Sequence, residues 1–310
     1  HSLNYFLRNK FGEKIYKISL DGGFTCPNRD GKVAKGGCTF CSARGSGDYA
    51  GSRILSISEQ FEDRKVMMEK KWKDGKYIAY FQAYTNTYAP VEELRRKYDE
   101  ALAQKNVVAL SIATRPDCLD KDVLDYLEEL NKKTYLWVEL GLQTINDNTA
   151  RNFNRGYDLE VFDKSIKELQ KRGIEVVVHT IFGLPGETKE DMLKTVDYVA
   201  HSGSQGVKFH LLHLMKGTKM VEQYESGELK LLSKEDYIDL ICKGIAMIPE
   251  EMVVHRLTGD APRASLIGPM WSLKKWEVLN DIDKAQARTL YKLSRVLGCS
   301  IEDLLENPEL

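Results

Sequence analysis

Residues 15–41 read IYKISLDGGFTCPNRDGKVAKGGCTFC. The run Ile15–Leu20 alternates apolar and polar side chains, which is typical of a β-strand. A glycine-rich loop follows at once, and it carries three cysteines: Cys26, Cys38 and Cys41. Because α/β folds keep their functional loops at the carboxyl ends of strands, we expect a metal site in this loop.

Five further stretches predict strands, because each is short, apolar and followed by turn residues. They span 77–81, 107–113, 135–142, 175–182 and 207–212. Helical patterns lie between them, for example after Asp158 and Thr188, which suit helix N-caps. Strands that alternate with helices predict a parallel sheet with right-handed crossovers.

Six strand–helix units fit before residue 250, and a full eight-stranded barrel would need two more. The remaining residues show no further units of this kind. We therefore predict an α/β fold, an incomplete (β/α)6 parallel barrel over residues 1–250. A C-terminal extension, residues 251–310, is expected to cover the barrel mouth. The runner-up is an open doubly wound sheet.

The composition is that of a globular protein, with 42% hydrophobic and 29% charged residues among 310. The net charge of −1 shows no global basic excess of the kind that nucleic-acid binders often carry. This charge neither supports nor excludes an RNA substrate. No apolar run is long enough to span a bilayer, and no signal-peptide pattern opens the chain, so we expect a cytoplasmic location without a membrane partner.

Three of the six cysteines crowd into 16 residues, which points to metal ligation. A closed structural zinc site needs four protein ligands, whereas three thiolates on a [4Fe–4S] cluster leave one iron open to S-adenosylmethionine (SAM). The alternatives are a zinc ion completed by His179 or His255 and a redox Cys-x-x-Cys. We expect the other three cysteines to be buried. Cys118 is the one among them that could have a functional role, because it follows a strand end.

The cysteine loop and two later motifs resemble the radical SAM superfamily. Phe40 matches the aromatic residue that contacts adenine there. Gln143 and Arg155 match residues that bind the ribose and SAM. The stretch from His179 to Gly183 is similar to the fifth-strand motif along the adenine. The resemblance implies cleavage of SAM to a 5′-deoxyadenosyl radical.

Two departures from the common pattern of that superfamily are informative. The cysteine spacing is eleven and two residues, and the second strand ends in Gln82-Ala83-Tyr84-Thr85 in place of a glycine-rich turn. The long first spacing and the stretch 114–117, Thr-Arg-Pro-Asp, resemble an Elongator-like branch that acts on tRNA wobble uridine. Ala113 replaces the acid that commonly precedes this stretch.

The candidate site residues form three groups. The expected metal ligands are Cys26, Cys38 and Cys41. The residues expected to contact SAM are Phe40, Gln82, Ala83, Tyr84, Thr85, Thr114, Arg115, Gln143, Arg155, His179 and Gly183. The residues expected to act on or contact the substrate are Glu139, Cys118, His210, Asp260 and Arg263.

The C-terminal part resembles a small bacterial subfamily, and this resemblance implies the substrate. It implies action on carboxymethylaminomethyl-uridine in tRNA, with a downstream methyltransferase and an electron donor such as flavodoxin or ferredoxin. A small metabolite such as a porphyrinogen or a sugar is a second possibility, and a noncatalytic iron–sulfur or zinc protein is a third. A positive groove beside the cysteine loop would favour RNA.

Overall fold

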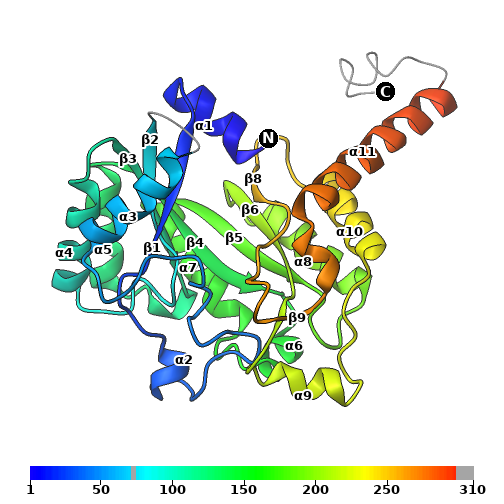
Figure 1. The fold of residues 1–310 in the computed structure, drawn as a ribbon, viewed down its shortest axis with the longest axis horizontal. Coiled ribbons are helices and arrows are strands. Elements are labelled where there is room, and N and C mark those ends of the chain that lie inside the picture. Colours follow the sequence, from blue (N-terminus) through cyan, green and yellow to red (C-terminus); the bar gives the residue numbers. More distant parts are fainter. Residues whose placement is uncertain (71–74, 298–310) are drawn as a thin grey trace.

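The computed structural model describes residues 1–70 and 75–297, which form a curled parallel sheet with helices on its outer side (Figure 1). The sheet order is β1-β2-β3-β4-β5-β6-β8. Its strands are β1 (Ile15–Leu20), β2 (Lys76–Phe81), β3 (Val107–Thr114), β4 (Tyr135–Gln143), β5 (Glu175–Phe182), β6 (Gly206–Leu211) and β8 (Val253–Arg256). The six predicted strands and the incomplete parallel barrel are confirmed.

The count of six strands is one too few, because β8 pairs in parallel with β6 beyond residue 250. This strand has four residues, so its periodicity is too short to stand out in the sequence. The division of the chain at residue 250 stays a prediction. A separate antiparallel pair, β7 (Leu214–Met215) and β9 (Leu266–Gly268), joins the loop after β6 to the loop after β8.

The helices connect the strands, and several of the longer ones pack on the outside of the sheet. They are α1 (Leu3–Phe11), α2 (Pro27–Asp30), α3 (Ile57–Glu69), α4 (Val91–Leu102), α5 (Lys121–Asn131), α6 (Asp147–Asn152), α7 (Leu159–Lys171), α8 (Lys189–His201), α9 (Met220–Glu225), α10 (Lys234–Met247) and α11 (Lys275–Leu297). Asp158 and Thr188 occupy the N-caps of α7 and α8 as predicted, and Thr188 forms a capping box with Asp191. In the part of the chain that the structure describes, we find no helix that could cross a membrane.

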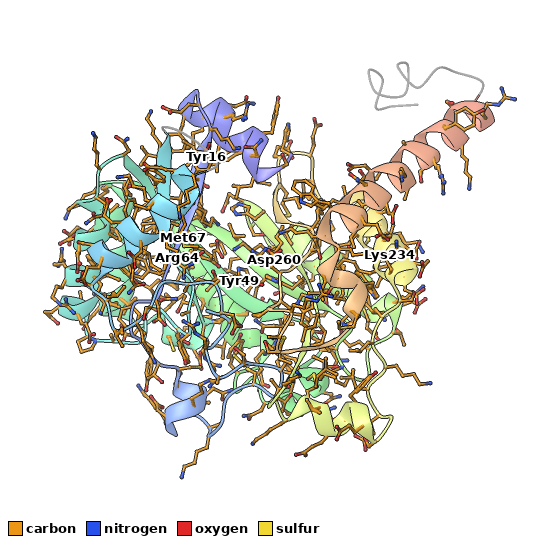
Figure 2. All side chains as sticks on the ribbon, viewed as in Figure 1. Tyr16, Tyr49, Arg64, Met67, Lys234 and Asp260 are labelled. Carbon is orange, nitrogen blue, oxygen red and sulfur yellow. The ribbon has the colours of Figure 1, made fainter. Side chains whose placement is uncertain are left out.

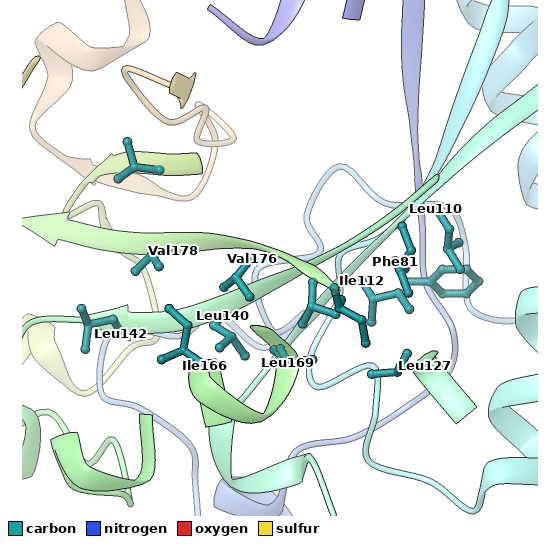
Figure 3. Packing of buried hydrophobic residues seen from close by; sticks show 14 of the residues in the cluster. Phe81, Leu110, Ile112, Leu127, Leu140, Leu142, Ile166, Leu169, Val176 and Val178 are labelled. Carbon is teal, nitrogen blue, oxygen red and sulfur yellow. The ribbon is translucent and has the colours of Figure 1, made fainter. Parts of the chain in front are cut away.

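The main core lies between the outer face of the sheet and the helices. Leu140 of β4 and Val176 of β5 pack with Ile166 and Leu169 of α7, all almost inaccessible to solvent (Figure 3). Burial of an aliphatic side chain of this size contributes about 1.5–3 kcal/mol, so this layer supplies most of the stability of the fold.

A smaller apolar cluster fills the amino-terminal end of the barrel. Leu7 of α1 packs there against Ile15, Ile78 and Trp137. Helix α1 lies at this end, whereas α2 and α9 lie at the opposite end, where the strands finish (Figure 1). This cluster packs at the amino-terminal end, whereas the largest cavity of the barrel opens at the carboxyl ends of the strands.

Candidate active site at the carboxyl edge of the sheet

A cavity of about 580 Å³ opens at the carboxyl edge of the sheet, and most of the predicted site residues line it. Those on its wall are Cys26, Cys38, Phe40, Cys41, Gln82, Tyr84, Thr85, Thr114, Arg115, Glu139, Gln143, Arg155, His179, His210 and Asp260. Ala83, Gly183, Cys118 and Arg263 lie outside it. Position alone assigns no role, so the individual contacts stay predictions.

The cavity is bounded on its open side by loops from the two edge strands. Tyr49 follows β1 and Asp260 follows β8, and both side chains line the cavity. The two residues lie near each other in Figure 2, and the charge of Asp260 helps burial to raise the pKa of Tyr49. The first and last strands of the sheet therefore both contribute to the rim.

The cysteine loop folds tightly against the loops after β2 and α6. The Cys41 N–H donates to the Cys38 carbonyl (2.9 Å), and the Thr39 N–H donates to the Phe153 carbonyl (3.0 Å). Gly45 has a φ of 55°, and a Cβ there would lie 2.4 Å from the Tyr84 ring. A larger residue could not occupy this position without moving the loop.

The environment of the three sulfurs suits metal-bound thiolates. Asn28, which is fully buried, donates from Nδ2 to Cys38 Sγ (3.6 Å), and the Arg29 guanidinium donates to the backbone carbonyls of Cys41 and Ser42. Burial raises the pKa of the Cys38 thiol to about 12 and also raises that of Cys41. As free thiols, Cys38 and Cys41 would stay protonated, and a bound metal centre would ionise them. The residues present therefore fit a cluster held by three thiolates.

The zinc alternative does not fit the same residues. Among the described residues, no group of three or more His, Cys, Asp or Glu side chains is arranged to hold a single metal ion. His179 Nε2 is hydrogen-bonded to Glu139 Oε2 (2.9 Å), and the His255 ring packs on Trp137 at 5.7 Å. Three thiolates on an iron–sulfur cluster bind different irons, so they need not converge on one point.

Arg155 is only 1% exposed, and its guanidinium donates hydrogen bonds to backbone carbonyl oxygens and to a carboxylate. It donates to the carbonyls of Leu142 (2.8 Å), Thr144 (2.7 Å) and Tyr157 (2.9 Å) and to Asp147 Oδ1 (2.8 Å). Four of its five N–H donors are thus used, and one remains for a ligand. The expected SAM contact of Arg155 stays a prediction. If Arg155 binds the carboxylate of SAM directly, it can donate only one hydrogen bond to it.

Gln143 and Arg115 flank Arg155 in the cavity wall. Gln143 ends β4 with a φ of 65°, a left-handed conformation that is strained for a residue other than glycine and that recurs at functional sites. Arg115 forms a bidentate ion pair with Asp117 (2.7 and 2.8 Å) and stacks on Tyr157 at 4.8 Å. These contacts fix the side chains at the ends of β3 and β4.

Glu139 is the centre of a buried polar layer deeper in the barrel. Five side chains contact its carboxylate: Lys17 Nζ (3.2 Å), Ser111 Oγ (2.8 Å), Trp137 Nε1 (3.1 Å), His179 Nε2 (2.9 Å) and Lys208 Nζ. Burial alone would raise the pKa of Glu139, but the charges of Lys17 and Lys208 outweigh it and hold the pKa well below its usual value. Glu139 is therefore ionised, and its surroundings make it a structural hub rather than a free acid.

The two histidines of this layer are neutral at physiological pH. Burial and then the charge of Lys208 lower the pKa of His179 to about 4, and burial lowers that of His210 strongly. The rings lie 4.9 Å apart, and His210 Nε2 is buried without a hydrogen-bond partner. An unpaired buried nitrogen on a cavity wall is a place where a ligand can bind.

Several wall residues were missed by sequence reasoning. Five residues in or beside the cavity were not among the predicted site residues: Asn28, Tyr80, Tyr157, Lys208 and Arg256. Lys208 carries the clearest signal, because it interrupts an apolar strand at the same parity as His210. Arg256 lies on the short strand that the sequence did not reveal.

Two family models match the chain. The model of the radical SAM superfamily matches residues 26–199, and that of the radical SAM C-terminal domain matches residues 204–288. The chain is 58% identical over 284 residues to Bacillus subtilis YtqA, covering 92% of this chain and 88% of the relative. It is 39% identical over 279 residues to Escherichia coli YhcC, covering 90% and 89%.

A solved structure also shares the fold. The archaeal Elp3 of Methanocaldococcus infernus superposes with a TM-score of 0.66 at 19% identity. The similarity covers 87% of this chain and 63% of that chain. The similarity therefore extends over most of this chain.

Proposed function

Because this chain belongs to the radical SAM superfamily, we propose that it modifies tRNA and that its substrate is carboxymethylaminomethyl-uridine at the wobble position. A [4Fe–4S] cluster and SAM are the cofactors of this superfamily, and together they supply a 5′-deoxyadenosyl radical that removes a hydrogen atom. Cys26, Cys38 and Cys41 would hold the cluster. Loss of that hydrogen atom and of one further electron, which the oxidised cluster could accept, would convert the CH2–NH unit of the carboxymethylamino arm into an imine. Hydrolysis of the imine would break the C–N bond, release the two carbons as glyoxylate and leave the uridine with an aminomethyl arm, on which a methyltransferase would act next.

Exposed cations on two loops that contribute to the cavity wall are the observation that carries the RNA proposal. Lys32, Lys35 and Arg44 lie on the cysteine loop, and Lys216 and Lys219 lie on the loop after β6. None of the five forms an ion pair with another residue of 1–70 or 75–297. Although the net charge of the chain is −1, these side chains give the rim a local positive charge that suits a phosphate backbone.

The cysteine loop and the loop after β6 lie together on this rim. A Cβ on Gly36 would lie 3.3 Å from Lys219 Nζ, so Lys219 of the second loop lies against the cysteine loop. The cavity of about 580 Å³ is in the range of small-molecule sites. Because the cluster and SAM would occupy part of it, the uridine would enter from its open side. An anticodon-loop base is unpaired and can enter such a site without disrupting a helix.

Sequence and fold similarities support the same class of substrate. The stretch Thr114–Asp117, with its Arg115–Asp117 ion pair, resembles the Elongator-like branch, and the fold is shared with archaeal Elp3. Asp260 lines the cavity and Arg263 is exposed on the same loop, which supports the proposal that both contact a bound anticodon. The proposed reaction needs an external reductant such as flavodoxin or ferredoxin, and its substrate would place the protein in the cytoplasm.

The proposal is tested by incubating the reduced, reconstituted protein with SAM and tRNA from a strain that lacks the gene. The tRNA is then digested to nucleosides and analysed by mass spectrometry. We expect carboxymethylaminomethyl-uridine to decrease and aminomethyl-uridine to increase, in proportion to the 5′-deoxyadenosine formed. A Cys38→Ala variant serves as the inactive control. If 5′-deoxyadenosine forms while the nucleosides stay unchanged, the substrate is a small metabolite instead.

A further inference from the structure

Basic side chains outnumber acidic ones in the polar layer inside the barrel. Lys17, Lys208 and Arg256 come from β1, β6 and β8, and Glu139 of β4 is the acid that faces them. Both lysines bond to Glu139, whereas Arg256 does not. Lys208 is buried, whereas Lys17 and Arg256 are half-buried, and an excess of one charge in such a layer is costly unless an opposite charge compensates it. The layer is therefore suited to a negatively charged ligand group.

Among the residues that the structure describes, no acid forms a hydrogen bond or ion pair with Arg256. The Glu139 oxygens already have five neighbouring side chains, as described above. Asp260 pairs with Lys275 (2.8 Å), and Asp48 accepts from Ser42 Oγ (3.2 Å). Across the described residues, the Arg256 guanidinium has no hydrogen bond or ion pair. Since arginine stays charged at all physiological pH values, this cation is permanently without a partner there.

A register shift aims Arg256 into the cavity. Val207 of β6 is opposite Val254 of β8, but the next residue, Lys208, is opposite Arg256, so His255 is an extra residue in β8. Such a bulge redirects the side chain that follows it, and bulges are frequent beside active sites. Arg256 lies on the wall of the large cavity and also borders a second cavity of about 560 Å³ between α1, β8 and α11.

His210 adds a second polar group next to Arg256. Its Nε2 is buried without a hydrogen-bond partner, and its ring lines the same cavity. Burial, His179 and the charge of Arg256 together lower the pKa of His210, so the guanidinium lies within electrostatic reach of the ring. A permanent cation and an unpaired imidazole nitrogen on one wall form an incomplete binding site for an anion.

We infer that Arg256, with His210 beside it, binds the carboxylate of the substrate, which is the end of the carboxymethyl arm on the wobble uridine. This inference rests on the proposed function. A guanidinium matches a carboxylate in a bidentate geometry, and the pairing is strongest in a site from which water is excluded. Arg256 is thus a specificity-determining residue for the proposed reaction.

The position of the subsite sets the direction of the bound arm. Arg256 lies in the layer of Lys208 and Glu139, below the cysteine loop at the carboxyl edge. A carboxylate held there leaves the rest of the arm extended toward the cysteine loop. The aminomethyl product lacks the carboxylate, so it binds more weakly and leaves the site. Arg256 therefore distinguishes substrate from product.

The test is equilibrium binding of two RNAs to the reconstituted protein with SAM and without reductant, so that no turnover occurs. One anticodon stem-loop carries carboxymethylaminomethyl-uridine and the other carries aminomethyl-uridine. The unaltered protein should bind the first roughly tenfold to a hundredfold more tightly, which is the effect of one charged hydrogen-bonded pair. Arg256→Gln should bind both RNAs alike, and Arg256→Lys should recover part of the preference.

Arg96→Gln is the matched control, because Arg96 is exposed on α4, outside the cavity, and makes no ion pair among the described residues. It should keep the full preference. If Arg256→Gln also keeps it, the inference is overturned while the proposed function stands. If Arg256→Gln weakens SAM binding by the same factor, the guanidinium serves the cofactor and the inference is again wrong. A lack of preference in the unaltered protein would overturn the proposed substrate and the subsite together.

Discussion

The two faces of the same sheet differ in what they contribute. On β6, Val207, Phe209 and Leu211 point outward into the core beneath α8 and α10, whereas Lys208 and His210 point into the barrel. The outer face is apolar and gains stability from buried area. The inner face is polar, and its stability depends on each charge having its partner. Alternate residues of β6 thus have different roles: those on the outer face pack in the core, and those on the inner face line the site.

The largest difference between the faces should appear when Glu139 is neutralised. Glu139→Gln leaves Lys17 and Lys208 buried without their counter-ion, and we expect the free energy of unfolding to fall by about 3–5 kcal/mol. Urea denaturation followed by circular dichroism measures this change. The double variant Glu139→Gln, Lys208→Met should recover part of the lost unfolding free energy, because one of the two unpaired lysine charges is then removed.

The outer-face counterpart is Leu140→Ala, at the next position of β4. It should cost about 2–5 kcal/mol through the cavity that it leaves, and no second substitution of a charged residue should rescue it. If Lys208→Met rescues Leu140→Ala as well as it rescues Glu139→Gln, the two faces are not energetically distinct.

The inner face should also make stability depend on pH through His179. The pKa of His179 is about 4 in the folded state, against about 6.5 for an unperturbed histidine. Between these values the unfolded chain binds more protons, so this stabilisation is complete above pH 6.5 and is lost as the pH falls toward 4. The loss amounts to roughly 3 kcal/mol.

His179→Gln keeps a donor for Glu139 but does not titrate. The difference in unfolding free energy between the parent and this variant should therefore change by roughly 3 kcal/mol between pH 7 and pH 4. A difference that stays constant across this range would show that His179 titrates normally in the folded protein.

A smaller effect is expected where β4 ends at the cavity. Gln143→Ala should weaken SAM binding by roughly tenfold, the contribution of about one hydrogen bond, while iron content stays unchanged. Arg155→Ala should lower stability as well as SAM affinity, because its guanidinium supports the carbonyls of Leu142 and Thr144. SAM titration and urea denaturation of both variants separate these two kinds of loss. Equal losses of stability in the two variants would contradict the distinction.

The smallest effect concerns the rim. Lys32→Gln should reduce the affinity for tRNA only a few-fold, and it should lower the slope of log K against log salt by about one if Lys32 contacts a phosphate. Lys164→Gln on the exposed side of α7 is the control and should leave the slope unchanged. Identical slopes for both variants would show that the cysteine loop does not contact the RNA backbone.

The sequence predicted the outer face better than the inner one. Runs such as Glu175–Phe182 show a strand directly, and Cys26, Cys38 and Cys41 are recognisable by their spacing. Arg256 could not be found, because its strand has four residues and its direction depends on a bulge. The hydrogen-bond partners of Arg155 could not be predicted either, since an arginine that supports a loop and one that binds a ligand look the same in a sequence.

We propose that Cys26, Cys38 and Cys41 hold the cluster at the carboxyl edge of the inner face. This claim can be tested by iron analysis and electron paramagnetic resonance of the anaerobically reconstituted, reduced protein, with and without SAM. We predict about four irons per chain, a spectrum that SAM alters, and loss of both in Cys26→Ala, Cys38→Ala and Cys41→Ala but not in Cys118→Ala. Tightly bound zinc without an iron spectrum, or an unaltered cluster in any of the three loop variants, would contradict the claim.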